Sequence, residues 1–176
     1  NISYHEAVEL AYYGATVIHP KTIKPLQNKN IPLLVKSFVN PDEEGSIINE
    51  NTAKDSLIPS FIFKTNQILI SISPRDYSFI AEDNLSQIFG CFAKHKVTVN
   101  LMQNSAISFS ICTDNQKMKI ANLIEELKAD YKVYYNDELL LLTVRHYNEE
   151  TLSKLLKDKT IYVEQKSRQT ARFVVK

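Results

Sequence analysis

The strongest constraint on the fold is the order of hydrophobic periods in residues 67–127. Residues 67–73 read as a strand, and apolar side chains then recur at helical spacing through residues 85–92. Two more strand patterns and a second helical face come next, at residues 97–102, 106–112 and 120–127. One further strand would complete a ferredoxin-like βαββαβ unit. The segment therefore predicts an α+β fold with two helices on one face of an antiparallel sheet.

The same order begins again after residue 137. A strand is expected at residues 138–145, and Asn148 can cap a helix whose apolar positions end at Leu156. Two more strands are expected at residues 160–164 and 171–175. The repeat predicts two such domains in tandem. Because the second copy has no closing helix, we expect it to share a short strand at residues 60–64 or to pack against the first copy.

The first fifty residues carry helix signals of their own. Ser3 and Glu6 have the spacing of a capping box, and Gly14 is placed to end the helix that begins there. Pro20 suits the first turn of a second short helix. Residues 31–38 then read as a strand with a proline near its start, where a missing N–H is tolerable.

A polar, aperiodic stretch at residues 49–57 indicates a linker, with a domain boundary near Ser56. Three segments are expected: residues 1–56, 57–137 and 138–176. The chain opens directly into a helix without an initiator methionine, so we expect it to be a piece of a longer polypeptide.

The composition narrows the possible functions. With 44% hydrophobic residues and a formal charge of +1, the chain can bury cores and has no basic stripe for nucleic acid. Its apolar runs are shorter than the roughly 20 residues of a membrane helix. RNA-recognition modules share the βαββαβ order, but they need exposed aromatic residues on the central strands, and Phe109 is the only aromatic in residues 97–112. We therefore expect neither a nucleic-acid nor a membrane partner.

Cysteine and histidine usage points the same way. Cys91 and Cys112 fall within helix and strand patterns, where we expect buried hydrophobes and not a disulfide framework. This usage favours a reducing, cytoplasmic compartment. No histidine lies at a short ligand spacing from a cysteine or another histidine, so no metal site is expected.

Two segments closely resemble the late part of the aspartate kinase catalytic domain. They read SYHEAVELAYYGATVIHP at residues 3–20 and IPLLVKSFVNPDEEGSI at residues 31–47. By segment order and position, residues 57–176 resemble the paired ACT domains that end these enzymes. The resemblance is greatest to the monofunctional type that is regulated through its first ACT domain. It implies the end of a kinase domain and a linker over residues 1–56, a first ACT domain over 57–137 and an incomplete second one over 138–176.

The resemblance also implies a parent enzyme that phosphorylates the side-chain carboxylate of aspartate with ATP and magnesium, the first step toward lysine, threonine and methionine. The family's ATP and aspartate motifs would lie before residue 1. We therefore assign no catalytic residue and no cofactor to this chain, and we do not expect it to be an enzyme alone.

An effector site for an end-product amino acid, lysine or threonine, is implied at an interface between ACT domains across a homodimer. The matching positions are Ser78, Ala81, Asp83, Asn84, Leu85, Thr98, Val99, Asn100, Asn104, Ser105 and Ala106. Backbone groups at a strand end and at a helix N-terminus would supply donors for the ligand's carboxylate.

Three of these positions depart from lysine-binding relatives. Asn100 stands where they have aspartate, Ala106 where they have glutamate, and Asp83 where they have glycine. A buried ammonium group needs a partner, so lysine is not expected in the relatives' pose. Asp83 could supply the charge from a new direction, or the polar bend at residues 102–105 could suit threonine. In the alternative, the ACT pair only dimerises the enzyme. Arg145 and His146, at the end of a strand, are expected to face solvent.

Overall fold

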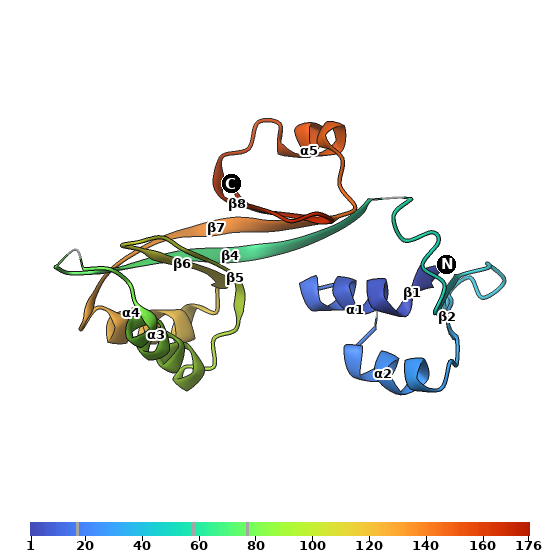
Figure 1. The fold of residues 1–176 in the computed structure, drawn as a ribbon, viewed down its shortest axis with the longest axis horizontal. Helices are drawn as coiled ribbons and strands as arrows, with labels where there is room; N and C mark the ends of the chain where they lie inside the picture. Colours follow the sequence, from blue (N-terminus) through green and yellow to red (C-terminus); the bar gives the residue numbers. More distant parts are fainter. Residues whose placement is uncertain (17, 58, 77) are drawn as a thin grey trace. The chain divides into compact units, whose positions relative to one another are not determined.

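The computed structural model describes residues 1–16, 18–57, 59–76 and 78–176. These residues form two sheets and five helices (Figure 1). In chain order the elements are β1 Ile2–Ser3, α1 Tyr4–Tyr13, α2 Pro20–Asn28, β2 Leu33–Val35, β3 Ser46–Asn49, β4 Ser60–Pro74, α3 Glu82–Lys94, β5 Val99–Asn104, β6 Phe109–Asp114, α4 Lys117–Leu127, β7 Tyr131–Arg145, α5 Glu149–Leu156, β8 Ile161–Lys166 and β9 Thr170–Val175.

The chain divides into two compact units, each built from separate stretches of sequence. Unit 1 contains Asn1–Phe63, Thr143–Lys157 and Lys166–Ala171. Unit 2 contains Lys64–Leu142, Asp158–Gln165 and Arg172–Lys176. The domain boundaries proposed at residues 56 and 137 follow the sequence order and stay predictions.

Unit 1 contains α1, α2 and the three-stranded sheet, and most of the local signals predicted there are found. The Ser3 hydroxyl accepts a hydrogen bond from the Glu6 backbone N–H at 3.0 Å, and Gly14 ends α1 in the left-handed region at φ 119°. Nδ1 of His19 caps α2 by accepting from the Lys21 N–H at 3.1 Å. Strand β3 pairs in parallel with β1 and antiparallel with β2. The core beneath the helices comprises Tyr4, Ala7, Ile23 and Ile48.

Unit 2 holds most of a six-stranded sheet in the order β5-β6-β4-β7-β9-β8. Strand β4 pairs antiparallel with β6 in a register that sets Gln67 opposite Asp114 and Ile72 opposite Phe109. Helices α3 and α4 cover one face of this part of the sheet (Figure 1). Ile68, Ile70 and Ile72 of β4 point into that layer, as expected from the alternation of side chains along a strand. The main core comprises Ile68, Ile70, Ile72, Ile80, Ile88, Phe92, Val97, Phe109, Ile111, Ile120, Leu123, Ile124, Leu127 and Tyr131.

The other face of the sheet has a core of its own. Its buried residues are Leu69, Leu101, Cys112, Leu139, Leu141, Val163 and Val174. Side chains of β8 and β9 reach the backbone of β5, although β5 and β8 are opposite edges of the sheet order. The Arg172 guanidinium donates to the Asn100 carbonyl and the Gln165 amide donates to the Met102 carbonyl, each at 2.6 Å. The sheet is therefore curved enough for its two ends to meet.

Two strands are longer than the sequence patterns predict. The separate strands expected at residues 60–64 and 67–73 are one strand, β4, and the strand expected at residues 138–145 begins earlier, at Tyr131. Each continuous strand contains one residue in the left-handed region, Asn66 at φ 53° and Glu138 at φ 55°. These local irregularities interrupt the side-chain alternation without ending the strand, so the pattern reads as a break.

Other element boundaries also differ from the prediction. The strand expected over residues 31–38 is confined to Leu33–Val35. Ser46–Asn49 forms a strand that the sequence did not predict, and its last residue is the first of the expected linker at residues 49–57. The second strand of the β5–β6 hairpin begins at Phe109, later than residue 106, because residues 105–108 form the turn. Asn148 caps α5 as predicted, accepting from the Thr151 N–H at 2.8 Å.

Gly45 is a glycine that unit 1 requires. It lies in the left-handed region at φ 70°, and an added Cβ would collide with the Val35 carbonyl. Gly90, inside α3, has open space around the corresponding position.

We expect Gly45→Ala to lower the free energy of unfolding by about 1–3 kcal/mol. Gly90→Ala should raise it by about 0.5–1 kcal/mol, because alanine is the better helix residue. Urea unfolding of both variants checks this, and equal effects would contradict it.

Candidate functional site

A polar hollow lies beside the start of α3 in unit 2. It has a volume of about 450 Å³ and is lined by Pro74, Arg75, Asp76, Ser78, Asn84, Gln87, Asp130 and Tyr131. The turn after β4, the first two turns of α3 and the turn before β7 supply these residues. The Asn84 side chain accepts from the Ala81 backbone N–H at 3.1 Å, which fixes the first turn of the helix. The hollow thus sits at the positive end of a helix dipole.

One wall of the hollow is a chain of side-chain hydrogen bonds from α3 to the start of β7. The Asn84 amide donates to the Tyr131 hydroxyl at 3.4 Å, and that hydroxyl donates to the Gln87 side-chain carbonyl at 2.7 Å. The Gln87 amide donates to the Asp130 carboxylate at 3.0 Å. Tyr131 is buried with its ring in the main core, so its hydroxyl has a fixed position. This wall is therefore preorganised.

Charges of both signs line the hollow. The Arg75 guanidinium donates to the Lys128 carbonyl, which orients it. Asp76 accepts from the Ser78 backbone N–H at 3.1 Å, and hydrogen bonds from the Ser78 side chain and backbone lower the pKa of that exposed carboxyl. Asp130 adds a second carboxyl group. A guanidinium suits a ligand carboxylate and carboxylates suit an ammonium group, so the arrangement fits a free amino acid.

The structure brings part of the predicted effector site to this hollow. Ser78 and Asn84 line it, whereas Ala81 and Asp83 are exposed at the start of α3 and Leu85 packs on the main core. The Ile80 backbone N–H donates to the Ala106 carbonyl at 2.9 Å, which holds the β5–β6 hairpin against the loop before α3.

The hairpin turn holds the next predicted positions. Asn104, Ser105 and Ala106 are exposed there, and the Ser105 and Ser108 hydroxyls lie 2.7 Å apart. They therefore belong to the same end of unit 2 as the start of α3.

Thr98, Val99 and Asn100 lie elsewhere. The Thr98 carbonyl accepts from the Thr113 hydroxyl at 2.7 Å, and Val99 packs on the main core. Asn100 is four residues from Asn104 along β5, about 13 Å at the usual rise per residue. The positions carried over from the resemblance therefore fall into two groups within the described residues.

Asn100 is the centre of a polar network on β4, β5 and β6. Its amide donates to Gln67 at 2.8 Å and to Asp114 at 2.9 Å, and its carbonyl oxygen accepts from Lys64 at 2.9 Å. Gln67 also donates to Asp114 at 2.8 Å. Burial raises the pKa of Asp114, but the Gln67 and Asn100 hydrogen bonds and the Lys64 charge bring it below its ordinary value. The network accounts for the orientation of Asn100 within the protein.

Six residues of the hollow were missed by sequence reasoning: Pro74, Arg75, Asp76, Gln87, Asp130 and Tyr131. One signal was available, because Gln87 follows Asn84 by three residues and so shares its helix face. Asp130 and Tyr131 come from the turn after α4, which only the folded chain brings to this place.

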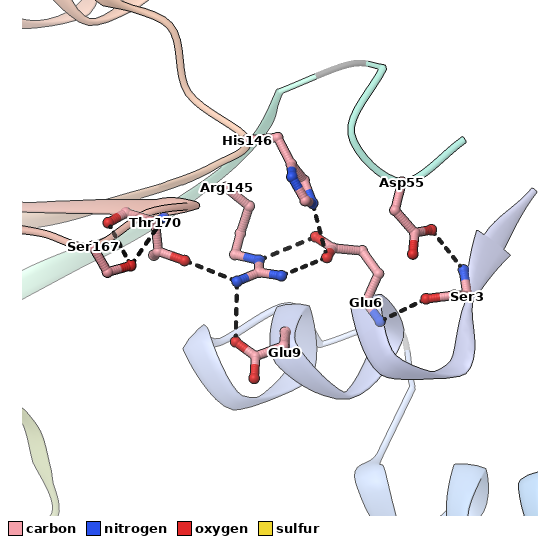
Figure 2. Close-up of polar contacts among 8 residues, drawn as sticks. All are labelled: Ser3, Glu6, Glu9, Asp55, Arg145, His146, Ser167 and Thr170. Atoms are coloured by element: carbon pink, nitrogen blue, oxygen red, sulfur yellow. Dashed lines mark hydrogen bonds and ion pairs between the residues drawn. The ribbon is translucent and has the colours of Figure 1, made fainter. Parts of the chain in front are cut away.

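A second polar cluster is buried in unit 1. The Arg145 guanidinium donates to both carboxylate oxygens of Glu6 at 3.2 and 2.6 Å, to Glu9 at 3.2 Å and to the Thr170 hydroxyl at 2.8 Å (Figure 2). His146 lies 3.0 Å from the same Glu6 carboxylate. The expectation that Arg145 and His146 face solvent is therefore wrong. Two acidic residues one turn apart on α1 draw them into the interior.

The same cluster corrects the capping box. Glu6 does not return to the backbone of Ser3; the Ser3 N–H donates instead to the Asp55 carboxylate at 2.9 Å (Figure 2). Burial raises the pKa of Glu6, but hydrogen bonds from Arg145 and His146 and their charges outweigh it, so that this pKa lies below its ordinary value.

Comparison with known proteins places this geometry in a family. No family model matches the chain. Aspartokinase 3, chloroplastic, of Arabidopsis thaliana is 30% identical over 130 residues, which cover 71% of this chain and 22% of that relative. The chain is homologous to the aspartokinases. It spans about a fifth of the length of this relative.

Solved structures carry the same fold. Escherichia coli aspartokinase III, in complex with lysine and aspartate, aligns with 98% of this chain at a TM-score of 0.79 and 23% identity, over 42% of its own length. A putative C-terminal regulatory domain of aspartate kinase from Porphyromonas gingivalis W83 aligns with 67% of this chain at a TM-score of 0.56 and 14% identity, over 85% of its length. The predicted α+β fold with a ferredoxin-like ACT pair is confirmed.

Two findings on the described residues concern metal-binding groups and membrane-spanning helices. No group of three or more histidine, cysteine, aspartate or glutamate side chains there could hold a metal ion. No helix in that part of the chain is long and apolar enough to cross a membrane.

The Glu6 cluster makes stability depend on pH. Because the pKa of Glu6 is lower in the folded than in the unfolded chain, its contribution is present above the ordinary value of 4.5 and is lost as pH falls through the folded pKa. We expect Glu6→Gln to lower the free energy of unfolding at neutral pH by about 3–5 kcal/mol, since buried Arg145 loses its partner. The variant should also flatten the acid limb of a stability profile measured by urea unfolding.

The matched control is Glu150→Gln. Glu150 pairs with Lys154 at 2.6 Å, but its side chain is 78% exposed. This variant should stay within about 0.5 kcal/mol of the parent. Equal losses of unfolding free energy in the two variants would show that the buried pair stabilises the fold no more than the exposed pair does.

Asn100→Ala tests the second network. Gln67, Asp114 and Lys64 would each lose a partner, so we expect the free energy of unfolding to fall by about 1–3 kcal/mol. Asn104→Ala, on the same strand at an exposed position, should change it by less than about 0.5 kcal/mol. Thermal unfolding of the two variants side by side gives the comparison, and an unaffected Asn100→Ala would remove the network's structural role.

Proposed function

We propose that the chain is the regulatory region of an aspartokinase, joined to the end of its kinase domain, and that a free amino acid binds in the hollow at the start of α3. The observation that carries this proposal is that one guanidinium, Arg75, and two carboxylates, Asp76 and Asp130, line the same polar hollow. Homology to aspartokinases supports the regulatory assignment.

The whole enzyme would transfer a phosphoryl group from ATP to the side chain of aspartate, the first step toward lysine, threonine and methionine. In this proposal ATP and magnesium are held by the rest of the polypeptide, and this chain contributes α1, α2 and their three-stranded sheet to the kinase domain. The proposed location is the cytoplasm, which the two free cysteines, Cys91 and Cys112, favour.

Among end products, lysine fits the charges best. Asn100 is occupied by its own network and Ala106 has no charge, so neither can hold an ammonium group. Instead of Asn100 and Ala106, Asp76 and Asp130 would bind the two ammonium groups of lysine, and Arg75 would bind the lysine carboxylate. Threonine is the alternative, bound through Ser78, Asn84 and Gln87, whose groups suit a hydroxyl ligand.

The partner in this proposal is a second copy of the chain. Phe79, Phe89 and Ile107 are exposed apolar residues at 74%, 37% and 45%. The Ile80–Ala106 hydrogen bond brings the segments of Phe79 and Ile107 together beside the hollow. A patch of this kind suits a homodimer contact. A competing function, in which the ACT pair only dimerises the enzyme, uses the same patch without a ligand.

Calorimetry with lysine, threonine and methionine tests the proposal on the chain and on two matched variants. Asp130→Asn removes a charge from the hollow, whereas Asp83→Asn removes one from an exposed position outside its lining. We expect Asp130→Asn to weaken binding about tenfold or more, as for the loss of a charge-assisted hydrogen bond, and Asp83→Asn to change it less than about twofold.

Sedimentation of the same samples separates the two functions. A dimer that binds one of the amino acids supports effector sensing. A folded dimer that gives no heat with any of the three would leave only the scaffold. Equal weakening in both variants would move the site away from the hollow.

A further inference from the structure

Strand β7 is held at its two ends by different polar clusters. Its first residue, Tyr131, forms part of the wall of the hollow, and its last residue, Arg145, lies in the buried ion cluster of α1. The strand is continuous between them, and it carries residues of both compact units, with the division after Leu142. The two clusters are therefore connected through the backbone of a single strand.

At the first end, the hydrogen bonds leave Tyr131 little freedom. Its hydroxyl is shared between Asn84 and Gln87, and the residue before it, Asp130, is bonded to Gln87. A ligand that engages Asn84, Gln87 or Asp130 must compete with or reinforce these bonds. Occupancy of the hollow thus acts directly on the start of β7.

At the other end, the Arg145 guanidinium has almost no contact with water, at 5% side-chain exposure. Its two bonds to Glu6 have the planar fork geometry that only arginine gives, and Glu9 and Thr170 take the remaining donor group. Glu6 and Glu9 both belong to α1, within the segment that resembles the end of the kinase domain. A buried bidentate pair tolerates little displacement, because a partly broken pair leaves charges unsolvated.

We propose that Arg145 is the coupling residue through which the amino-acid hollow acts on helix α1, with β7 as the connecting element. The inference rests on the proposed function of the hollow. The physical requirement is that the ligand binds better to one arrangement of β7 than to the other and that Glu6 follows Arg145 between them. Linkage then requires that a change at the Glu6–Arg145 pair alters ligand affinity by the same factor.

Hydrogen exchange of the chain, followed by mass spectrometry, tests the coupling with L-lysine and L-threonine as probes. In the parent chain, the active ligand should protect the amides around Ser78–Gln87 and change the exchange of α1 amides by about fivefold or more, the lower end of usual coupling factors. In Arg145→Met the hollow should still be protected, but the ligand-dependent change in α1 should disappear.

Two further variants separate coupling from simple loss of structure. Thr170→Val removes one hydrogen bond from Arg145 and keeps the Glu6 pair, so it should retain the α1 response. Arg145→Lys keeps the charge but cannot form the fork, so it should lose most of the response while α1 stays folded. The readout is the difference in exchange of the α1 amides with and without ligand. A helix that was only loosened would exchange faster in both conditions and would not lose this difference selectively.

The outcomes are distinct. Protection of the hollow without any α1 response in the parent chain would overturn the coupling and leave the proposed function standing. An α1 response that persists in Arg145→Met would overturn it as well, because the signal would then travel by another route. No protection of the hollow by either amino acid would overturn the proposed function and the coupling together.

Discussion

The buried bidentate pair between Arg145 and Glu6 is the interaction on which unit 1 depends. It joins the first helix of the chain to a strand end 139 residues later, at 2.6 Å for its shorter bond. A charge that is taken out of water needs a partner of opposite charge. Burying either Arg145 or Glu6 without the other would therefore be costly. Glu9, His146 and Thr170 surround the pair and satisfy the remaining donors and acceptors. Glu6, Arg145 and Thr170 come from the three separate stretches of sequence that make up unit 1, so the cluster joins all three.

Much of the fold could be predicted from sequence because the signals are local. The helical face at residues 85–92, the cap at Asn148 and the stop at Gly14 each depend on a few neighbouring residues, and each is found in the structure. The continuity of β4 and β7 could not be predicted, since Asn66 and Glu138 interrupt the alternation with a left-handed residue that pairing with neighbouring strands tolerates. Arg145 was missed for a related reason: its partners lie on a helix that the sequence places at the other end of the chain.

The candidate site divides in the same way. Resemblance predicts a site at the start of α3, and Ser78 and Asn84 line the hollow there. It also predicts Asn100 as a ligand-binding residue. Whether a side chain can bind a ligand depends on the face of β5 that it occupies and on the hydrogen-bond partners that neighbouring strands provide. Gln67, Asp114 and Lys64 supply a complete set of partners. Asp130 and Tyr131 were beyond sequence reasoning, because the turn after α4 meets α3 only through tertiary packing.

The contacts of β5 with Arg172 and Gln165 have a consequence for assembly. Edge strands offer rows of open carbonyl and amide groups on which another chain can add a strand, which is a common start of aggregation. The Asn100 and Met102 carbonyls on this edge already accept hydrogen bonds from side chains of β9 and β8. An incoming strand would have to displace both. The sheet is therefore protected against growth at β5.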